Sequence, residues 1–218
     1  MMKTKHFLSD IFIGILFTIF FICLGIYIVI HFRQLYYFDI NYLNIEAISS
    51  YPKNIILENY NVLMDYCSPF FHGDLAFPSL TITDAAYTHF EKVKTIFDVS
   101  FYTGCILFFI LFRIIVSKYK KKDFSYLKVS SITILILPVF CIAACTINWD
   151  ATFIIFHKIF FKGDYWLFDW NADQIIRILP DTYFLHCALC IVGIVILGSL
   201  ITFLFYLFSK KNAHSQNK

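Results

Sequence analysis

The sequence has few of the residues that soluble proteins place at their surfaces and turns. Only 15% of its 218 residues are charged, and it contains seven glycines and five prolines. Instead, 59% of the residues are hydrophobic and 20% are aromatic, whereas soluble domains are roughly 45–50% apolar. The composition is therefore that of a membrane protein, and the formal net charge of +3 gives no indication of nucleic-acid binding.

Several catalytic and structural motifs are missing. The chain has no Gly-x-Ser-x-Gly sequence, the mark of a serine nucleophile, and no His-x-x-x-His or Glu-x-x-His pair that would bind a metal on a helix. Six of the seven cysteines fall in apolar runs and only Cys67 lies in a loop, so a disulfide framework is not expected. A metal site is disfavoured, although a third ligand is available among His72, His186, Asp84 and Asp173.

Four apolar runs are long enough to cross a bilayer as helices, which takes about 20 residues. They cover residues 9–32, 99–117, 127–147 and 183–208. The first run is longer than a signal-peptide core and has no small-residue cleavage site after it, so we expect it to remain as a helix. We predict an all-α integral membrane protein with four transmembrane helices in a single membrane domain, residues 1–218.

The lysines indicate the orientation of these helices, because positive residues concentrate on the cytoplasmic side. They lie before the first run, between the second and third runs, and after the fourth: Lys3, Lys5, Lys118, Lys120, Lys121, Lys122, Lys128, Lys210, Lys211 and Lys218. Residues 33–98 and 148–182 carry 13 of the 15 acidic residues. We therefore expect both termini in the cytoplasm and an extracytoplasmic cap formed by the two outer loops, 33–98 and 148–182.

Two histidines lie at the centre of apolar stripes in the outer loops. After a helix start at Thr83, residues 85–97 place apolar side chains three and four positions apart around His89, and residues 153–161 do the same around His157. Imidazole is the side chain best suited to move a proton near neutral pH. Each histidine alone fits a buried structural role, but the pair predicts an acid–base site.

Two further features indicate other roles. Arg177 lies one turn after Asp173, where it binds a lipid phosphate or an oxyanion, or forms an ion pair with Asp173 or Asp181. Cys187 and Cys190 form a Cys-x-x-Cys pair at the outer end of the fourth run, as in a redox-active dithiol. A membrane thiol oxidoreductase is therefore an alternative function, and a non-catalytic membrane sensor or assembly protein is another.

Three stretches carry a resemblance to a known family: AAYTHFEKVKTIF (85–97), TFIIFHKIFFKGDYWLF (152–168) and NADQIIRILPDTYF (171–184). Together with the four helices, they resemble the Lit family, the lipoprotein intramolecular transacylases of Gram-positive bacteria. One departure is Lys92, which stands where the family pattern often has an acid; Glu91 lies beside it.

The resemblance implies an activity at the outer face of the bacterial cell membrane. The sn-2 acyl chain of a diacylglyceryl-cysteine lipoprotein would move to the α-amine of its N-terminal cysteine, without a cofactor or a metal. His157 would be the general base and His89 its partner or the acid. The candidates for binding the substrate or its oxyanion are Arg177, Tyr87, Trp166, Asp173, Phe156 and Phe160. The implied partners are diacylglyceryl-modified lipoproteins and membrane lipids.

Overall fold

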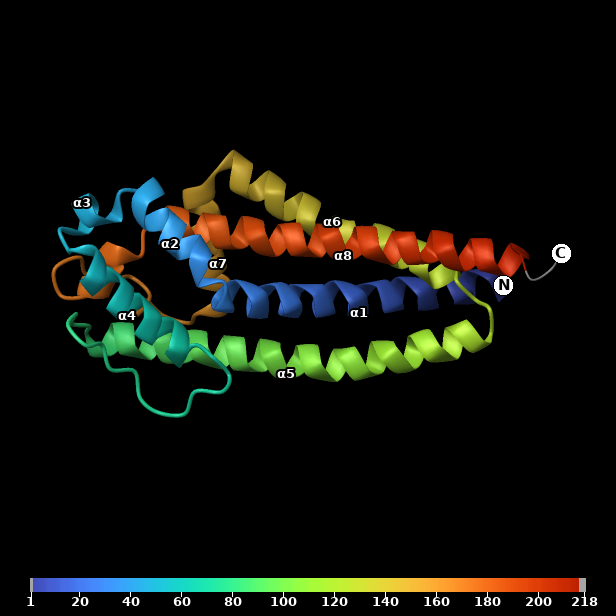
Figure 1. The fold of residues 1–218 in the computed structure, drawn as a ribbon, viewed down its shortest axis with the longest axis horizontal. Coiled ribbons are helices and arrows are strands. Elements are labelled where there is room, and N and C mark those ends of the chain that lie inside the picture. The colour runs from blue at the N-terminus through green and yellow to red at the C-terminus, as the bar shows by residue number, and fades with distance from the viewer. Residues whose placement is uncertain (1, 216–218) are drawn as a thin grey trace. The chain divides into compact units, whose positions relative to one another are not determined.

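The computed structural model describes the backbone of residues 2–215 and the side chains of residues 7–211. It contains eight α-helices and one 3₁₀ helix within this range, and no strand, which confirms the all-α prediction. The helices are α1 (Met2–His31), α2 (Arg33–Tyr42), α3 (Ile45–Ser49), α4 (Lys53–Tyr66), α5 (Asp84–Lys120), α6 (Ser125–Ile147), α7 (Trp149–Phe160), η1 (Gln174–Ile178) and α8 (Asp181–Ser215) (Figure 1).

Four of these helices, α1, α5, α6 and α8, are long and apolar enough to cross a membrane, as the sequence predicted. Helix α5 has 37 residues, or about 55 Å at about 1.5 Å per residue, which exceeds the roughly 30 Å of a bilayer core. It runs without a break from the predicted start at Thr83 through the second apolar run. Part of α5 therefore extends beyond the apolar run, and this part carries His89.

The chain divides into two compact units. Within the described residues, the first comprises 2–25, 101–143 and 190–215, and the second comprises 26–100 and 144–189. The first unit contains most of the four long helices. The second contains α2, α3, α4, α7 and η1 together with the adjoining ends of the long helices, and all of the predicted site residues belong to it.

A cluster of buried tyrosines holds the second unit together. Tyr36 and Tyr60 are fully buried, and their rings stack at 3.6 Å. The Tyr36 hydroxyl donates to the Ile178 carbonyl (2.6 Å), and the Tyr60 and Tyr183 hydroxyls lie 2.8 Å apart. Buried tyrosines are stable when their hydroxyls find such partners. The cluster thereby links α2 and α4 to η1 and to the start of α8.

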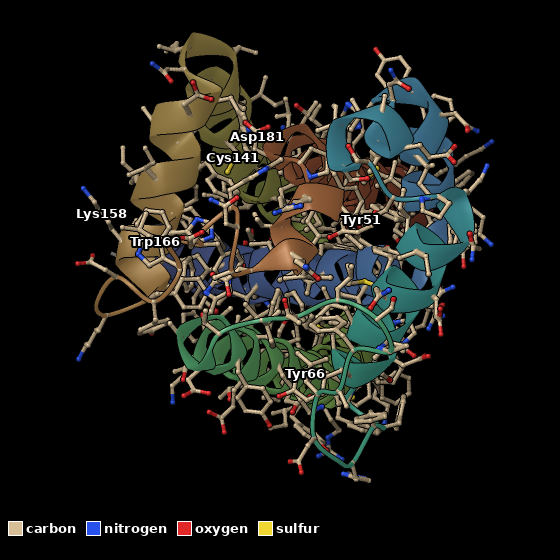
Figure 2. All side chains as sticks on the ribbon, turned by 90° about the vertical axis from the view of Figure 1, so that its left-hand side faces the viewer. Tyr51, Tyr66, Cys141, Lys158, Trp166 and Asp181 are labelled. Carbon is tan, nitrogen blue, oxygen red and sulfur yellow. The ribbon has the colours of Figure 1, made fainter. Side chains whose placement is uncertain are left out.

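Residues 33–66 are mostly helical. They form α2, α3 and α4, and α4 begins at Lys53 and ends at Tyr66. Figure 2 looks onto this unit, with Tyr66 at the end of α4 and Trp166 beside α7.

In the first unit, α1 makes close contacts with the other three long helices through small residues. A Cβ atom added to Gly14 would lie 2.8 Å from Thr133 Cβ on α6, and one added to Gly198 on α8 would lie 2.6 Å from the Phe21 ring. A Cβ atom added to Gly104 on α5 would lie 3.1 Å from Cys23 Cβ on α1. Small residues at such positions allow membrane helices to approach closely.

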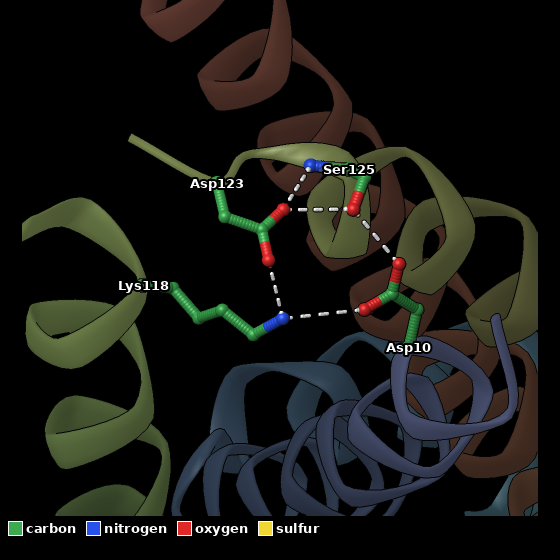
Figure 3. A network of polar contacts seen from close by, with 4 residues as sticks. All are labelled: Asp10, Lys118, Asp123 and Ser125. Atoms are coloured by element: carbon green, nitrogen blue, oxygen red, sulfur yellow. Dashed lines mark hydrogen bonds and ion pairs between the residues drawn. The ribbon is translucent and has the colours of Figure 1, made fainter. Parts of the chain in front are cut away.

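A polar network joins three helices of the first unit near the lysine-rich link (Figure 3). Asp10 on α1 is 3% exposed, and its carboxylate lies 2.9 Å from Ser125 Oγ and 3.5 Å from Lys118 Nζ. Lys118 also pairs with Asp123 at 2.6 Å. Because a buried carboxylate is costly unless it is paired and hydrogen-bonded, this network accounts for an acid inside the first apolar helix.

We expect Gly14→Ala to destabilise the first unit by about 1–2 kcal/mol, because the added methyl group overpacks the contact with Thr133. Gly193→Ala is the matched control, since a Cβ at this α8 position meets nothing within 4 Å. Thermal unfolding in detergent should show a lower midpoint for Gly14→Ala alone. Equal midpoints for the two variants would contradict the close packing of α1 and α6.

Candidate active site

Helix α7 exposes its apolar residues and buries its histidine. It follows α6 directly, with Asn148 as the N-cap whose side chain accepts a hydrogen bond from Ala151 N (2.9 Å). His157 is its buried residue. The exposed side chains are mostly large and apolar: Ile154, Ile155, Phe156, Ile159 and Phe160. This is the reverse of the distribution that a surface helix adopts in water.

His89 on α5 and His157 on α7 lie next to each other. Their ring centroids are 5.8 Å apart, and the ring planes are inclined by 22°. The two residues are 7% and 9% exposed, so both histidines face the interior as their apolar stripes predicted. The structure thus brings together two imidazoles that are 68 positions apart in the sequence.

Aromatic rings surround the two imidazoles. The Phe161 centroid lies 4.6 Å from that of His89 and 5.5 Å from that of His157. Trp166 stacks on His157 at 4.9 Å, and Phe168 meets His89 edge-on at 5.2 Å. We call Phe161, Trp166 and Phe168 the aromatic cage. The cage excludes water from the pair, which strengthens hydrogen bonds formed inside it.

The hydrogen bond of His157 fixes its tautomer. Its Nδ1 lies 2.8 Å from the Phe153 carbonyl oxygen, which can only accept a hydrogen bond, so Nδ1 carries the proton. In the neutral ring, Nε2 is then an unprotonated acceptor. Desolvation by burial lowers the pKa of His157 and outweighs the opposite effect of the Phe153 hydrogen bond. His157 is therefore held neutral near pH 7, with its basic nitrogen unprotonated.

His89 has an uncommitted nitrogen. Its Nδ1 is buried and has no hydrogen-bond partner among the described residues. An unsatisfied buried polar atom of this kind costs about 1–3 kcal/mol. A polar atom of a bound molecule that hydrogen-bonds to His89 Nδ1 would remove this cost.

Three of the four predicted aromatic site residues lie on or near His157. Trp166 contacts His157 directly, as described above. Phe156 lies edge-on to His157 at 5.5 Å, and the Phe160 ring is tilted against that of Phe156 with the centroids 4.7 Å apart. Both phenylalanines are about half exposed, at 49% and 52%. They form the outer surface of α7 and do not belong to the cage.

The structure places the other predicted residues away from the pair. Tyr87 is two positions before His89, about 200° around the helix. It packs against the hydrophobic core that contains the buried tyrosines. Arg177 Nε donates to the Trp170 carbonyl (2.8 Å), and its guanidinium lies over the Trp170 ring. Within the described side chains, Arg177 forms no ion pair with an acid.

Asp173 occupies the N-cap position of η1, but its side chain does not cap that helix. Its carboxylate instead accepts hydrogen bonds from Thr83 N and Asp169 N, at 2.7 and 2.9 Å. It therefore contacts neither histidine.

Sequence reasoning missed the roles of Phe161 and Phe168. Phe161 is the first residue after α7 and follows His157 by four positions. The sequence therefore showed that it shares an apolar stripe with His157, but not that its ring lies beside both imidazoles. Phe168 lies in an irregular segment, where no period indicates direction. Its contact with His89 depends on how the loop folds back.

A mainly apolar groove of about 510 Å³ lies beside the pair. Phe153 lines it and also lies 4.2 Å from the His157 ring, centroid to centroid. The other lining residues are Leu43, Ile48, Trp170, Ile176, Leu179, Pro180, Asp181, Thr182 and Phe184. The groove is open, and neither histidine lines it.

Comparison with known proteins identifies the family. The family model of the lipoprotein intramolecular transacylase Lit matches residues 11–184. The chain belongs to the Lit family. The structure of the membrane-integral Lit from Bacillus cereus is 31% identical to this chain, covers 95% of it and 98% of its own length, and has a TM-score of 0.89. No match was found among curated proteins.

Two further solved structures are variants of the Bacillus cereus Lit. In one, a histidine is replaced by arginine; it is 30% identical to this chain with a TM-score of 0.86 and covers 99% of this chain and 96% of its own. In the other, a histidine is replaced by alanine, with the same identity and TM-score and 98% coverage of both chains. The all-α membrane fold and the acyltransferase class of this chain are therefore those of the Lit family.

Membership of the Lit family decides between the functions that the sequence left open. It favours a transacylase over a thiol oxidoreductase that would use Cys187 and Cys190. Two of the residues weighed as a third metal ligand have other partners: the His186 Nδ1 bonds to the Asp39 carboxylate at 2.9 Å, and Asp173 bonds to backbone.

We expect His157 to give this Lit-family protein a pH-dependent stability. Because the folded-state pKa of His157 lies below the ordinary value of 6.5, the unfolded chain binds more protons at this residue below that pH. The stability contribution is complete above pH 6.5 and is lost as the pH falls through the folded pKa. Thermal unfolding at a series of pH values should show this loss, reduced in His157→Gln. His72→Gln, at an exposed residue, should behave as wild type, and equal curves for His157→Gln and wild type would contradict the assignment.

Proposed function

We propose that this chain moves the sn-2 acyl chain of a diacylglyceryl-cysteine lipoprotein to the α-amine of the N-terminal cysteine. The observation that carries the proposal is the buried histidine pair. The pair offers one nitrogen fixed as an acceptor, His157 Nε2, and one uncommitted nitrogen, His89 Nδ1. Family membership supplies the reaction class, an intramolecular acyl transfer on a lipoprotein.

The chemistry needs three proton transfers, two from nitrogen and one to oxygen. The substrate α-ammonium, with a pKa near 8 in model peptides, first loses a proton so that the amine can attack the sn-2 ester carbonyl. A C–N bond forms, the C–O bond to the glyceryl oxygen breaks, the nitrogen gives up a second proton and the glyceryl oxygen takes one. The sum is amide, alcohol and one released proton. His157 accepts protons from nitrogen, and His89 donates to the leaving oxygen; such help contributes about 10²–10⁴ in rate.

No enzyme nucleophile is required for this reaction. The amine and the ester belong to one molecule, so the enzyme contributes by holding them together; well-oriented groups reach effective molarities of about 10⁵–10⁸ M. The cage and the groove beside Phe153 offer apolar surfaces on which acyl chains can be held. This accounts for a site built from rings and two imidazoles.

We further propose that the site lies at the outer face of the cell membrane. The lysines flank the long helices on the side that we assign to the cytoplasm, where both termini then lie. The second unit would form the extracytoplasmic cap. The exposed apolar face of α7 supports this position, because a helix with such a face is stable in the outer leaflet and not in water.

Expression of the chain in a bacterium depleted of its own lipoprotein N-acyltransferase tests the reaction. We expect a reporter lipoprotein to carry an N-acylated, S-monoacylglyceryl cysteine. Intramolecular transfer leaves the total mass unchanged, so tandem mass spectrometry of the N-terminal peptide must assign the acyl chain from fragment ions.

The same assay tests the histidines. His157→Ala and His89→Ala should each lower the product by about 10²–10⁴, whereas His72→Ala, at an exposed loop residue, should leave it unchanged. A diacylglyceryl cysteine with a free amine, made despite normal expression of the wild-type chain, would refute the transfer. Full turnover in both site variants would refute the catalytic roles.

Cysteine labelling tests the position of α7. In a variant whose native cysteines are replaced, Ile159→Cys places a thiol at a residue that is 71% exposed on the apolar face. We expect a water-soluble maleimide to label it slowly in membranes and rapidly after unfolding, because lipid covers the helix. Asp164→Cys, in the exposed turn that follows, is the control and should react in intact membranes. Equal reaction of both would place α7 in water.

A further inference from the structure

Asp173 connects two segments that carry the histidine pair and its cage. The residue is 3% exposed, and its two carboxylate oxygens accept separate backbone hydrogen bonds, from Thr83 N at 2.7 Å and Asp169 N at 2.9 Å. A buried carboxylate is stable only when its lone pairs are satisfied, and charge-assisted bonds are about twice as strong as neutral ones. Among the described residues, these two N–H groups are the partners of this side chain.

Each of the two partners leads directly to the site. Thr83 precedes α5, and its hydroxyl accepts from Ala86 N (3.2 Å), so Asp173 holds the start of the helix that carries His89 six positions later. Asp169 follows Phe168, whose ring contacts His89, and lies three positions after Trp166, whose ring stacks on His157. One carboxylate therefore connects the base of the helix to the loop that forms the cage.

Neighbouring bonds reinforce this junction, which we define as residues 81–83 and 169–174. Gln174 N donates to Thr81 O (2.9 Å), and Thr81 N donates to Gln174 Oε1 (3.1 Å). The Thr81 hydroxyl donates to the Ala172 carbonyl (3.3 Å). These bonds are partly exposed, whereas the Asp173 carboxylate lies inside, so Asp173 is the central element of the junction.

We infer that Asp173 is a positioning residue for the transacylation, which fixes the register between the start of α5 and the loop of Trp166 and Phe168. It acts through the cage and touches neither imidazole. The inference rests on the proposed roles of His89 and His157. Its physical basis is that acyl transfer between two groups of one substrate depends on their placement, where an error of about 1 Å costs about 100-fold in rate.

The test is Asp173→Asn in the full-length protein. The amide keeps the volume of the carboxyl group but presents an N–H to one of the two backbone donors, so one bond of the junction is lost. We expect kcat to fall about 10- to 100-fold with little change in KM and with normal yield of folded protein. Asp164→Asn makes the same chemical change at an exposed residue of the same loop and should retain wild-type kcat.

A second readout separates positioning from a general loss of structure. The chain has three tryptophans, so in a Trp149→Phe, Trp170→Phe background the emission reports Trp166, which stacks on His157. Asp173→Asn should shift the wavelength of this emission. It should also weaken the change in emission that accompanies protonation of His157. Asp164→Asn should leave both properties as in the wild type. If Asp173→Asn yields no folded protein, Gln174→Ala, which removes only the bond to Thr81 N, should produce the same shift with a smaller fall in kcat.

The outcomes are distinguishable from failure of the proposed function. Turnover within two-fold of wild type in Asp173→Asn, or lost turnover with unchanged Trp166 emission, would overturn the positioning role; so would wild-type kcat and emission in Gln174→Ala. If His89→Ala and His157→Ala keep full turnover, the catalytic assignment fails instead, while the emission of Trp166 still shows whether Asp173 orders the loop.

Discussion

A polar group that is buried among apolar side chains costs free energy unless it finds a partner within the protein, and this constraint shapes the second unit. Tyr36 and Tyr60 bond to a carbonyl and a hydroxyl, Asp173 bonds to two backbone amides, and the His157 Nδ1 bonds to Phe153 O. Each bond joins or fixes segments whose arrangement forms the site. Five buried side-chain atoms have no hydrogen-bond partner in the described structure: His89 Nδ1, Asp98 Oδ1, Ser100 Oγ, Ser130 Oγ and Trp149 Nε1.

Helical spacing was enough to predict that His89 and His157 each share a face with apolar side chains, because a period of 3.6 residues shows which side chains share a face. It did not show which face is buried. Phe156 and Phe160 share the apolar stripe of His157, yet they are about half exposed while Phe161 is 4% exposed. In water an apolar stripe turns inward, but next to lipid an apolar side chain is stable on either side. The hydrophobic pattern of α7 therefore could not separate cage residues from surface residues.

The roles of Asp173 and Arg177 were beyond sequence reasoning for a different reason. Both residues lie near or in a short 3₁₀ helix whose contacts are with backbone groups: Asp173 bonds to Thr83 N, 90 positions away, and Arg177 bonds to Trp170 O. Backbone acceptors and donors occur at every residue, so no residue type marks the partner. The ion pair considered for Arg177 followed from charge alone. Its position over the Trp170 ring is an alternative that charge does not reveal.

The unpartnered nitrogen of His89 also links occupancy to folding. A lipoprotein amine or ester oxygen that hydrogen-bonds to it binds the folded state and not the unfolded one, and any such ligand raises the free energy of unfolding. If the proposed reaction takes place in the cage, the empty protein is the less stable form. A cell that supplies more lipoprotein substrate would thereby protect this enzyme against unfolding and proteolysis. Its lifetime in the membrane would then increase with the concentration of substrate.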